Sequence, residues 1–446
     1  MKSYEPELKY KMHAERVMLM LPLNVVMVAK IKGDIDIAQL KSTLNRLRER
    51  HALLSVRVAI EEDNTASFMT KDVPDFEVRA IPREKDDQWL EAAISECKNS
   101  FDVTVGPLVR FTLVNSSARS ELLVCGHHAI CDGKSMTYLI RDILQYLTEP
   151  DKRLDVLPVP PPITADTIGS QSGSKLIARW FLRIFNWKWA KKKIKFDTND
   201  LKRLHELYWR KNAGMKLLVW ELSEADTESL ISRCKKEEVT VNSALWTAFL
   251  AAQYEVQDDG KLFRPMSGLA VSNRDKLNVP VGEAFGFYAS SFSTPLDYNS
   301  RVTFWDAARS IHDQIGASLE KTDIFRMLVA ESIHPTLLDS LYFSKYGLLK
   351  SNISNKMLKQ MKWDGLSNGY AITNVGKTDI PADYKTLILE ALYGPIVYSD
   401  VNEKTVGVIT LKNKLTFVMS YNESVVDNIK AEKIRKATLN NISNAL

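Results

Sequence analysis

The sequence has few cysteines, little excess charge and no long apolar run. The four cysteines are Cys97, Cys125, Cys131 and Cys234, and none belongs to a C-x-x-C pair. A disulfide framework is therefore not expected in a chain of 446 residues. A formal net charge of +5 is small for this length and gives no support for nucleic-acid binding, which usually shows as a concentrated basic face. There is also no P-loop and no zinc-finger spacing.

Nothing in the sequence predicts export or membrane insertion. Residues 1–16 are polar and charged, which is wrong for a secretory signal. The apolar run 17–29 contains Pro22 and Asn24 and is too short to span a bilayer, so it predicts a buried strand. We therefore expect a cytoplasmic protein without a transmembrane segment.

The length and the composition predict two mixed α/β halves. A chain of this size usually exceeds one hydrophobic core, and a hydrophobic content of 45% is ordinary for a globular protein. Residues 150–174 are rich in proline, glycine and serine, which is typical of a linker. The expected parts are a first half (1–150), a Pro-rich linker with a basic aromatic helix (151–214), and a second half (215–446).

Apolar spacing predicts the main elements. Residues 122–127 form a buried strand, a tight turn follows, and the apolar positions from Met136 to Leu147 trace one face of a helix. Residues 405–421 read as a hairpin. The other expected strands are 22–31, 53–60, 108–114, 266–273 and 285–293, and the other expected helices are 37–47, 86–99 and 242–254.

The informative segment is GHHAICDG, residues 126–133. Neighbouring side chains of a strand point to opposite faces, so His127 and His128 cannot both line one cavity. One of them must be structural and the other available. Gly133 is expected to permit unusual backbone angles at the turn. Asp132 can accept hydrogen bonds from the turn or pair with a cation.

A histidine in this position suits acyl transfer from a thioester. An alcohol or amine that attacks a thioester must lose a proton, and imidazole titrates near neutrality. The thioester is already activated, so neither a metal nor a covalent nucleophile is needed. A zinc site is not expected because Cys125, His127, His128 and Cys131 share one strand and turn. Nothing marks Cys131 as a nucleophile, and residues 133–137 (GKSMT) lack the G-x-S-x-G pattern of serine hydrolases.

The pattern H-H-x-x-x-D-G on a strand-to-helix turn resembles the signature of the chloramphenicol acetyltransferase-like superfamily. This superfamily includes nonribosomal peptide condensation domains, polyketide-associated acyltransferases and alcohol acyltransferases. Further segments resemble the same family in the expected order: residues 50–54 (RHALL), 101–110 (FDVTVGPLVR), 272–274 (SNR) with Gly286, and 373–376 (TNVG). The plant-type D-F-G-W-G segment is absent, and Tyr393-Gly394-Pro395 stands near its place.

The resemblance implies a fold and a site. The fold is a V-shaped pseudo-dimer of two chloramphenicol acetyltransferase-like halves with a central tunnel. His128 is then the catalytic base, whereas His127, Asp132 and Gly133 are structural, and Arg274 pairs with Asp132. Ser135, Tyr288 and Asn374 are expected along the substrate tunnel. No metal and no cofactor is expected, and acyl-CoA or a phosphopantetheinyl acyl carrier protein serves as co-substrate.

Three functional hypotheses stay open. The first is an acyltransferase, expected to be a monomer, that esterifies a hydroxyl acceptor from a CoA or carrier-protein thioester. The second is a free-standing condensation enzyme that forms an amide between carrier-bound substrates. The third is a catalytically silent homologue that only binds a carrier protein or acyl ligand, against which the intact His128, Asp132 and Gly133 count.

Residues 175–195 form a second unusual feature, with eight basic and no acidic residues interleaved with aromatic ones. A basic helix with an aromatic face can lie on an anionic membrane, which would favour a lipid-like acceptor. The alternative is a connecting helix packed on the second half. The histidines His13, His51, His205, His312 and His334 are scattered singly and predict no function.

Overall fold

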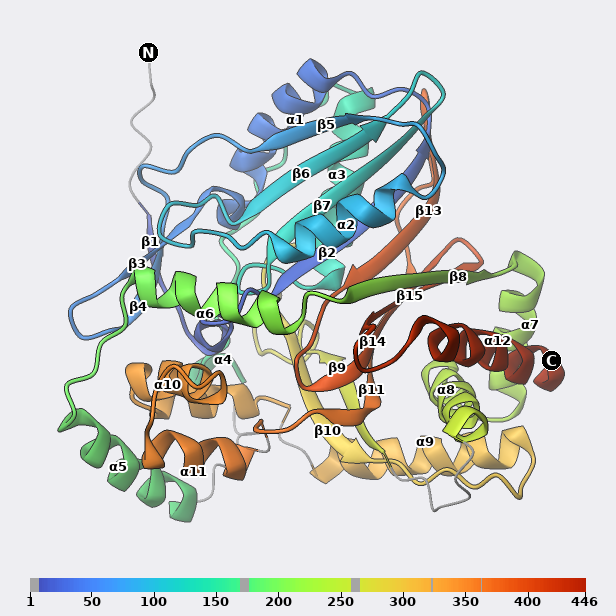
Figure 1. Cartoon of the computed structure of the whole chain (residues 1–446). Coiled ribbons are helices and arrows are strands. Elements are labelled where there is room, and N and C mark those ends of the chain that lie inside the picture. Colours follow the sequence, from blue (N-terminus) through green and yellow to red (C-terminus); the bar gives the residue numbers. More distant parts are fainter. Residues whose placement is uncertain (1–7, 169–175, 258–264, 322–323, 362) are drawn as a thin grey trace.

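The computed structural model describes residues 8–168, 176–257, 265–321, 324–361 and 363–446 (Figure 1). In these ranges the framework consists of two six-stranded sheets and one three-stranded sheet, with helices against the sheets. The expected mixed α/β architecture is confirmed, with one large sheet for each predicted half. The central tunnel stays a prediction.

The first sheet has the strand order β12-β13-β2-β7-β6-β5. Its strands are β2 (Asn24–Lys32), β5 (Val78–Pro82), β6 (Val109–Asn115), β7 (Arg119–His127), β12 (Asp383–Tyr384) and β13 (Leu387–Ile396). The central strands are almost continuously apolar because helices cover both faces. α1 (Ile37–Arg50) and α3 (Gly133–Thr148) lie on one face, and α2 (Gln88–Lys98) lies on the other (Figure 1). The strands expected at 22–31, 108–114 and 122–127 and the helices expected at 37–47 and 86–99 are confirmed.

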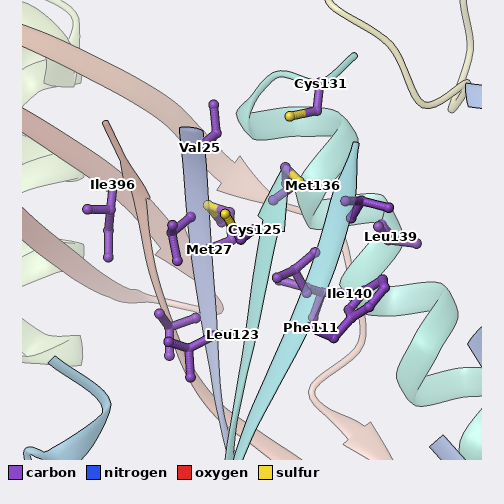
Figure 2. Packing of buried hydrophobic residues seen from close by; sticks show 14 of the residues in the cluster. Val25, Met27, Phe111, Leu123, Cys125, Cys131, Met136, Leu139, Ile140 and Ile396 are labelled. Atoms are coloured by element: carbon purple, nitrogen blue, oxygen red, sulfur yellow. The ribbon is translucent and has the colours of Figure 1, made fainter. Parts of the chain in front are cut away.

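The core of this sheet forms where α3 packs onto β7 and β2. Figure 2 shows Met136, Leu139 and Ile140 of α3 beside the strands, with Cys131 on the turn above them. All four side chains are fully buried. The apolar face expected from Met136 to Leu147 is the face that α3 buries here, and it holds the turn at the start of α3 against the end of β7.

The second sheet has the order β10-β9-β11-β14-β15-β8. Its strands are β8 (Met215–Leu222), β9 (Met266–Ser272), β10 (Ala289–Pro295), β11 (Ser367–Thr378), β14 (Asn402–Leu411) and β15 (Lys414–Asn422). Its helices are α7 (Glu224–Lys236), α8 (Val241–Gln257), α9 (Phe304–Lys321) and α12 (Asn428–Ala445). The expected hairpin is β14–β15, and the expected helix 242–254 is α8.

Two expected strands begin later than predicted. In 53–60, residues Ala52–Ser55 form a 3-10 turn (η2), and only β3 (Arg57–Ile60) is a strand, in the small sheet with β4 (Ala66–Met69) and β1 (Lys9–Lys11). In 285–293, strand β10 starts at Ala289. Phe285 and Tyr288 lie in the loop before β10 and are buried against the first half. They are apolar because the loop is buried, and not because they belong to a strand.

The second half of the sequence contributes strands to the first sheet. β13 comes from the second half of the sequence but pairs antiparallel with β2, from Ile388 opposite Lys32 to Ile396 opposite Val26. The sequence predicted no strand here. The first sheet is therefore completed by residues of the second half, and one hydrophobic cluster joins residues of both halves.

In its described residues, the segment between the halves contains three helices. They are α4 (Ala165–Ile168), α5 (Leu176–Ala190) and α6 (Thr198–Lys211). The expected basic aromatic segment 175–195 is helical only in part: α5 ends at Ala190, the lysines from 191 to 195 follow it, and Lys175 lies outside the described residues. α5 lies beside α10 (Pro335–Lys345), α11 (Asn352–Met361) and the 3-10 segment η4 (Arg326–Ser332), away from both sheets (Figure 1). No helix in the described ranges has the length and apolarity needed to cross a bilayer.

Candidate active site

The two adjacent histidines lie at the end of β7, where the strand turns toward α3. The His127 N–H donates to the carbonyl oxygen of Leu108 (2.9 Å), and the His128 N–H donates to that of Leu23 (2.8 Å). These bonds keep the chain extended, so the two side chains leave on opposite faces. His127 is 1% exposed, whereas His128 keeps partial access to solvent. The expected division into a buried and an available histidine therefore matches the geometry.

The orientation of His128 is set by the turn that follows it. Nδ1 lies 2.9 Å from the carbonyl oxygen of Cys131. A carbonyl oxygen only accepts hydrogen bonds, so Nδ1 carries the proton and Nε2 keeps a free lone pair in the neutral ring. The ring of Phe287 stands perpendicular to the imidazole at 5.2 Å between centroids. Together these contacts fix both the ring plane and the tautomer.

The protonation state of His128 follows from its surroundings. Burial lowers its pKa, and the hydrogen bond to Cys131 and the charge of Asp132 oppose this shift only in part. The ring is therefore neutral at pH 7. A neutral imidazole with a free Nε2 is the form that a general base requires.

His127 has the properties of a core residue. Burial lowers its pKa to about 3, so the ring is neutral. Its Nδ1 accepts the N–H of Ala129 at 3.2 Å, which stabilises the start of the turn. The rings of His127 and Phe101 are 6.2 Å apart in a T-shaped arrangement, and the Arg110 guanidinium lies 4.2 Å from the centre of the Phe101 ring. Residues 101–110 thus support the buried histidine.

Asp132 connects the turn to the second half of the chain. Its Oδ1 accepts the N–H of Ser135 at 2.7 Å in a capping box at the start of α3, and it lies 3.2 Å from Nη2 of Arg274. Its Oδ2 accepts the N–H of Tyr288 at 3.0 Å. The predicted Asp132–Arg274 ion pair is confirmed, and both residues are buried. Arg274 also donates to the carbonyl oxygen of Ala284 at 3.0 Å.

Gly133 is required for a reason other than the predicted one. It is not among the glycines with positive φ in the described residues. A Cβ at this position would lie 2.6 Å from Cγ of Pro395 and 2.8 Å from Cγ2 of Val375. The glycine therefore allows β13 and β11 of the other half to approach the turn closely. The prediction of unusual backbone angles was wrong, and close packing is the cause.

The three residues expected along the tunnel differ in their surroundings. The Ser135 hydroxyl is fully buried and donates within the cap or to Gly286, 3.1 Å away. Tyr288 is 2% exposed and donates to the carbonyl oxygen of Pro161 at 2.6 Å. Asn374 is half-buried, and its Oδ1 accepts the N–H of Gly376 at 2.9 Å. Contact with a substrate stays a prediction for all three.

A buried charge network beside α3 was missed. Oδ2 of Asp142 accepts from Nε of Arg50 at 2.7 Å and lies 2.9 Å from Nε2 of His51. Arg141 pairs with Asp142 and with Glu283 from the other half. No role was predicted for His51, yet it is fully enclosed in this network, and burial lowers its pKa. The sequence feature that could have revealed this network is Asp142, because it is a carboxylate among the apolar residues of α3.

The cysteines near the site are buried thiols. Burial raises the pKa of Cys125 to about 12 and that of Cys131 well above its ordinary value. Neither therefore provides a thiolate at neutral pH. Across the described ranges, no three or more His, Cys, Asp or Glu side chains form a group that could hold a metal ion.

The segment that contains this turn matches a known protein family. Residues 23–171 match the model of the Condensation domain family. Cyclosporin synthetase simA of Tolypocladium inflatum is 25% identical over 313 residues (66% of this chain), and tyrocidine synthase 3 of Brevibacillus parabrevis is 22% identical over 310 residues (66% of this chain). The match spans only 2% and 4% of the length of these two relatives.

Two solved structures have a similar fold over nearly the whole chain. Polyketide synthase associated protein 5 from Mycobacterium tuberculosis has a TM-score of 0.63 at 14% identity, with 98% of this chain and 100% of that chain covered. TRI3 trichothecene 15-O-acetyltransferase from Fusarium sporotrichioides has a TM-score of 0.65 at 11% identity, with 99% and 97% covered. At these identities the likeness concerns the fold.

Proposed function

We propose that this chain transfers an acyl group from a thioester to a hydroxyl group. The proposal starts from its fold, that of the chloramphenicol acetyltransferase-like superfamily, and from the condensation-domain match over residues 23–171. The donor is acyl-CoA or an acyl group on a carrier protein, and His128 is the general base. The observation that carries this proposal is the free Nε2 of a neutral imidazole whose Nδ1 is engaged by the Cys131 carbonyl oxygen.

The reaction needs one proton acceptor that later becomes a proton donor. Nε2 of His128 takes the hydroxyl proton while the acceptor oxygen attacks the thioester carbonyl carbon. The tetrahedral intermediate then collapses, the carbon–sulfur bond breaks, and the proton passes from Nε2 to the leaving thiolate. Such a positioned base typically contributes about 10²–10⁴-fold.

Asp132 acts on this reaction as a positioning residue. It is bonded to Ser135, Tyr288 and Arg274, and the structure records no contact between its carboxylate and the His128 ring among the described hydrogen bonds. By fixing the turn, it holds the Cys131 carbonyl oxygen opposite Nδ1 of His128. The tautomer of the base therefore depends on the ion pair between the halves.

Amide formation is the second candidate. One relative of similar sequence is named as a nonribosomal peptide synthetase, kk1B of Curvularia clavata, and a neutral amine would give its proton to the same Nε2. The chemistry at His128 is identical for both acceptors, so only the products distinguish them.

The test is product analysis by mass spectrometry. The chain is incubated with a panel of acyl-CoA thioesters and acyl-loaded carrier proteins, each offered with mixed alcohols and mixed amines. We expect an ester product that requires His128 and persists in the His127→Asn variant to the extent that this variant folds. Amide products alone would replace the first candidate by the second. Binding of a carrier protein with no transfer to any acceptor would overturn both.

A further inference from the structure

The helices α5, α10 and α11 with η4 form a small lobe (residues 182–196 and 326–361) that carries a charged face unrelated to the site at His128. One side of α5 is used for packing. Trp189 is fully buried against the lobe, and its Nε1 donates to Oγ1 of Thr336 at 2.9 Å. This anchor fixes which residues of α5 face solvent. We call the exposed cations of residues 182–196 and 346–361 together the basic face. The same lobe also exposes Glu331 of η4, which lies 2.9 Å from Nδ1 of His13.

The basic face has a strong local excess of positive charge. Residues 182–196 contain six basic and no acidic residues, and residues 346–361 contain three lysines and no acidic residue. The exposed cations are Arg183, Lys188, Lys191, Lys192, Lys193, Lys195, Lys350, Lys356 and Lys359. Within the described part of the chain, no ion pair involves any of them. Nζ of Lys192 lies 3.4 Å from Oγ of Ser351, which brings the end of α5 next to the start of α11.

An indole ring lies within this charge. Trp187 is 60% exposed and is the one aromatic residue among the exposed large hydrophobic residues in the described ranges. Nζ of Lys191 lies 3.4 Å from the centre of its ring. Exposing a tryptophan to water is unfavourable, and tryptophan with lysine is the pair that favours the interface between lipid headgroups and acyl chains.

We propose that the basic face binds the surface of an anionic lipid membrane. Dispersed cations and a single indole suit mobile lipid headgroups, which gather around each charge. A stable protein partner would need a shape-complementary apolar centre, whereas among the described residues of the lobe only Trp187 and Val329 are exposed large hydrophobic residues. Each lysine near such a surface strengthens binding by roughly fivefold at low ionic strength. The inference uses none of the residues at His128, so it stands or falls independently of the proposed chemistry.

The test is sedimentation of the full chain with lipid vesicles. One set contains phosphatidylcholine alone, and the other contains about 30% phosphatidylglycerol, at about 0.05 M and about 0.5 M salt. We expect binding to the anionic vesicles at low salt, weakened more than tenfold at high salt, and little binding to neutral vesicles. The triple variant Lys188→Glu, Lys191→Glu, Lys193→Glu should lose binding more than tenfold, and Trp187→Ala should weaken it several-fold.

A matched variant separates the basic face from net charge. Lys235→Glu, Lys433→Glu and Lys436→Glu change the charge equally at exposed positions of α7 and α12. This control should keep vesicle binding close to that of the parent chain, with equal melting temperatures for all variants. Equal loss in both triple variants, or no vesicle binding at low salt, would overturn the proposal. Retention on immobilised polyglutamate without vesicle binding would also overturn it, in favour of an acidic protein partner.

Discussion

At the scale of the residue, a main-chain carbonyl group decides what His128 can do. The Cys131 oxygen holds the proton on Nδ1, so the lone pair lies on Nε2, and the residue as a whole is partly exposed to solvent. His127, one position earlier, is buried beside Phe101 and cannot reach a substrate. The alternation of side chains along β7 thus converts adjacent identical residues into a candidate base and a core residue.

Alanine at these two positions should separate activity from stability. His128→Ala should lower turnover by about 10²–10⁴-fold, because the base is lost, with little change in melting temperature. His127→Ala should cost on the order of 2 kcal/mol of stability, because it leaves a buried cavity. Measured rates and denaturation midpoints check both. Equal activity loss in the two variants with no difference in stability would contradict the assignment.

The buried histidines should also make the fold sensitive to acid. Burial lowers the pKa of His127 to about 3 and that of His205 to about 4. Both are near 6.5 in the unfolded chain, so between pH 6.5 and 4 the unfolded state binds more protons. Stability is therefore fully present above pH 6.5 and falls as the pH decreases, by about 1.4 kcal/mol per pH unit for each histidine.

Urea denaturation at several pH values between 4 and 7 measures this slope. The asparagine of His127→Asn cannot bind a proton. The unfolding free energy of this variant should therefore fall less steeply with decreasing pH than that of the parent chain, by the equivalent of about one proton. Because other groups titrate equally in both chains, the difference isolates His127. Parallel slopes for the two chains would mean that His127 is not protonated on unfolding.

At the scale of the element, the start of α3 is held from the other half of the chain. Asp132 caps the helix and pairs with Arg274, and Gly133 lets Pro395 and Val375 approach the turn. These contacts act on one short segment that also carries the Cys131 carbonyl group. The start of α3 therefore connects the two halves and also holds the carbonyl group that orients His128.

Removing the charge of Asp132 should test this connection between the halves. Asp132→Asn strands the buried Arg274 guanidinium, which typically costs about 3–5 kcal/mol, and should lower turnover by displacing His128. Asp306→Asn is the matched control, because Asp306 pairs with Arg309 at half-exposed positions and should change neither stability nor rate appreciably. Thermal denaturation and initial rates measure both effects. Similar behaviour of the two variants would show that the buried pair does not support the turn.

A single methyl group at Gly133 should disturb the same connection. The added Cβ of Gly133→Ala would overlap Pro395 and Val375, and overpacking of this kind costs about 1–3 kcal/mol. Val375→Ala in the same chain should recover part of the loss. Gly316→Ala serves as control, since nothing lies within 4 Å of its Cβ. A Gly133→Ala chain as stable as the control would exclude the close-packing explanation.

The elements that could be predicted are those with a local apolar pattern. β2, β7, α3 and the β14–β15 hairpin were found because their residues repeat with strand or helix periodicity. β13 was missed because its partner β2 is remote in sequence and its end contains Gly394-Pro395, which suggests a turn. At the site, the histidine motif and the Asp132–Arg274 pair were found through family resemblance. The Arg50–His51–Asp142 network needs knowledge of which helix lies beside which loop.

At the scale of the whole molecule, the pairing of β13 with β2 in the first sheet makes the two halves dependent on each other. Without β13, strand β2 would become the edge of the first sheet and would expose the main-chain groups and apolar side chains that β13 covers. The shared core and the contacts of Arg274 and Glu283 with α3 and its turn cross the same boundary. The candidate site is therefore assembled only when both halves are folded together.

Expression of the halves as separate fragments tests this dependence. Residues 1–150 alone should aggregate, because β2 presents an unpaired apolar edge, whereas coexpression with residues 151–446 should give a soluble complex on size-exclusion chromatography. Attaching residues 382–397 through a flexible linker to residues 1–150 should improve solubility, since it restores the missing strands β12 and β13. The same segment with Leu389, Leu392 and Ile396 changed to Asp is the control and should fail, because those side chains are buried in the joint core. A fragment 1–150 that is monomeric and unfolds cooperatively on its own would show that the first sheet does not need the second half.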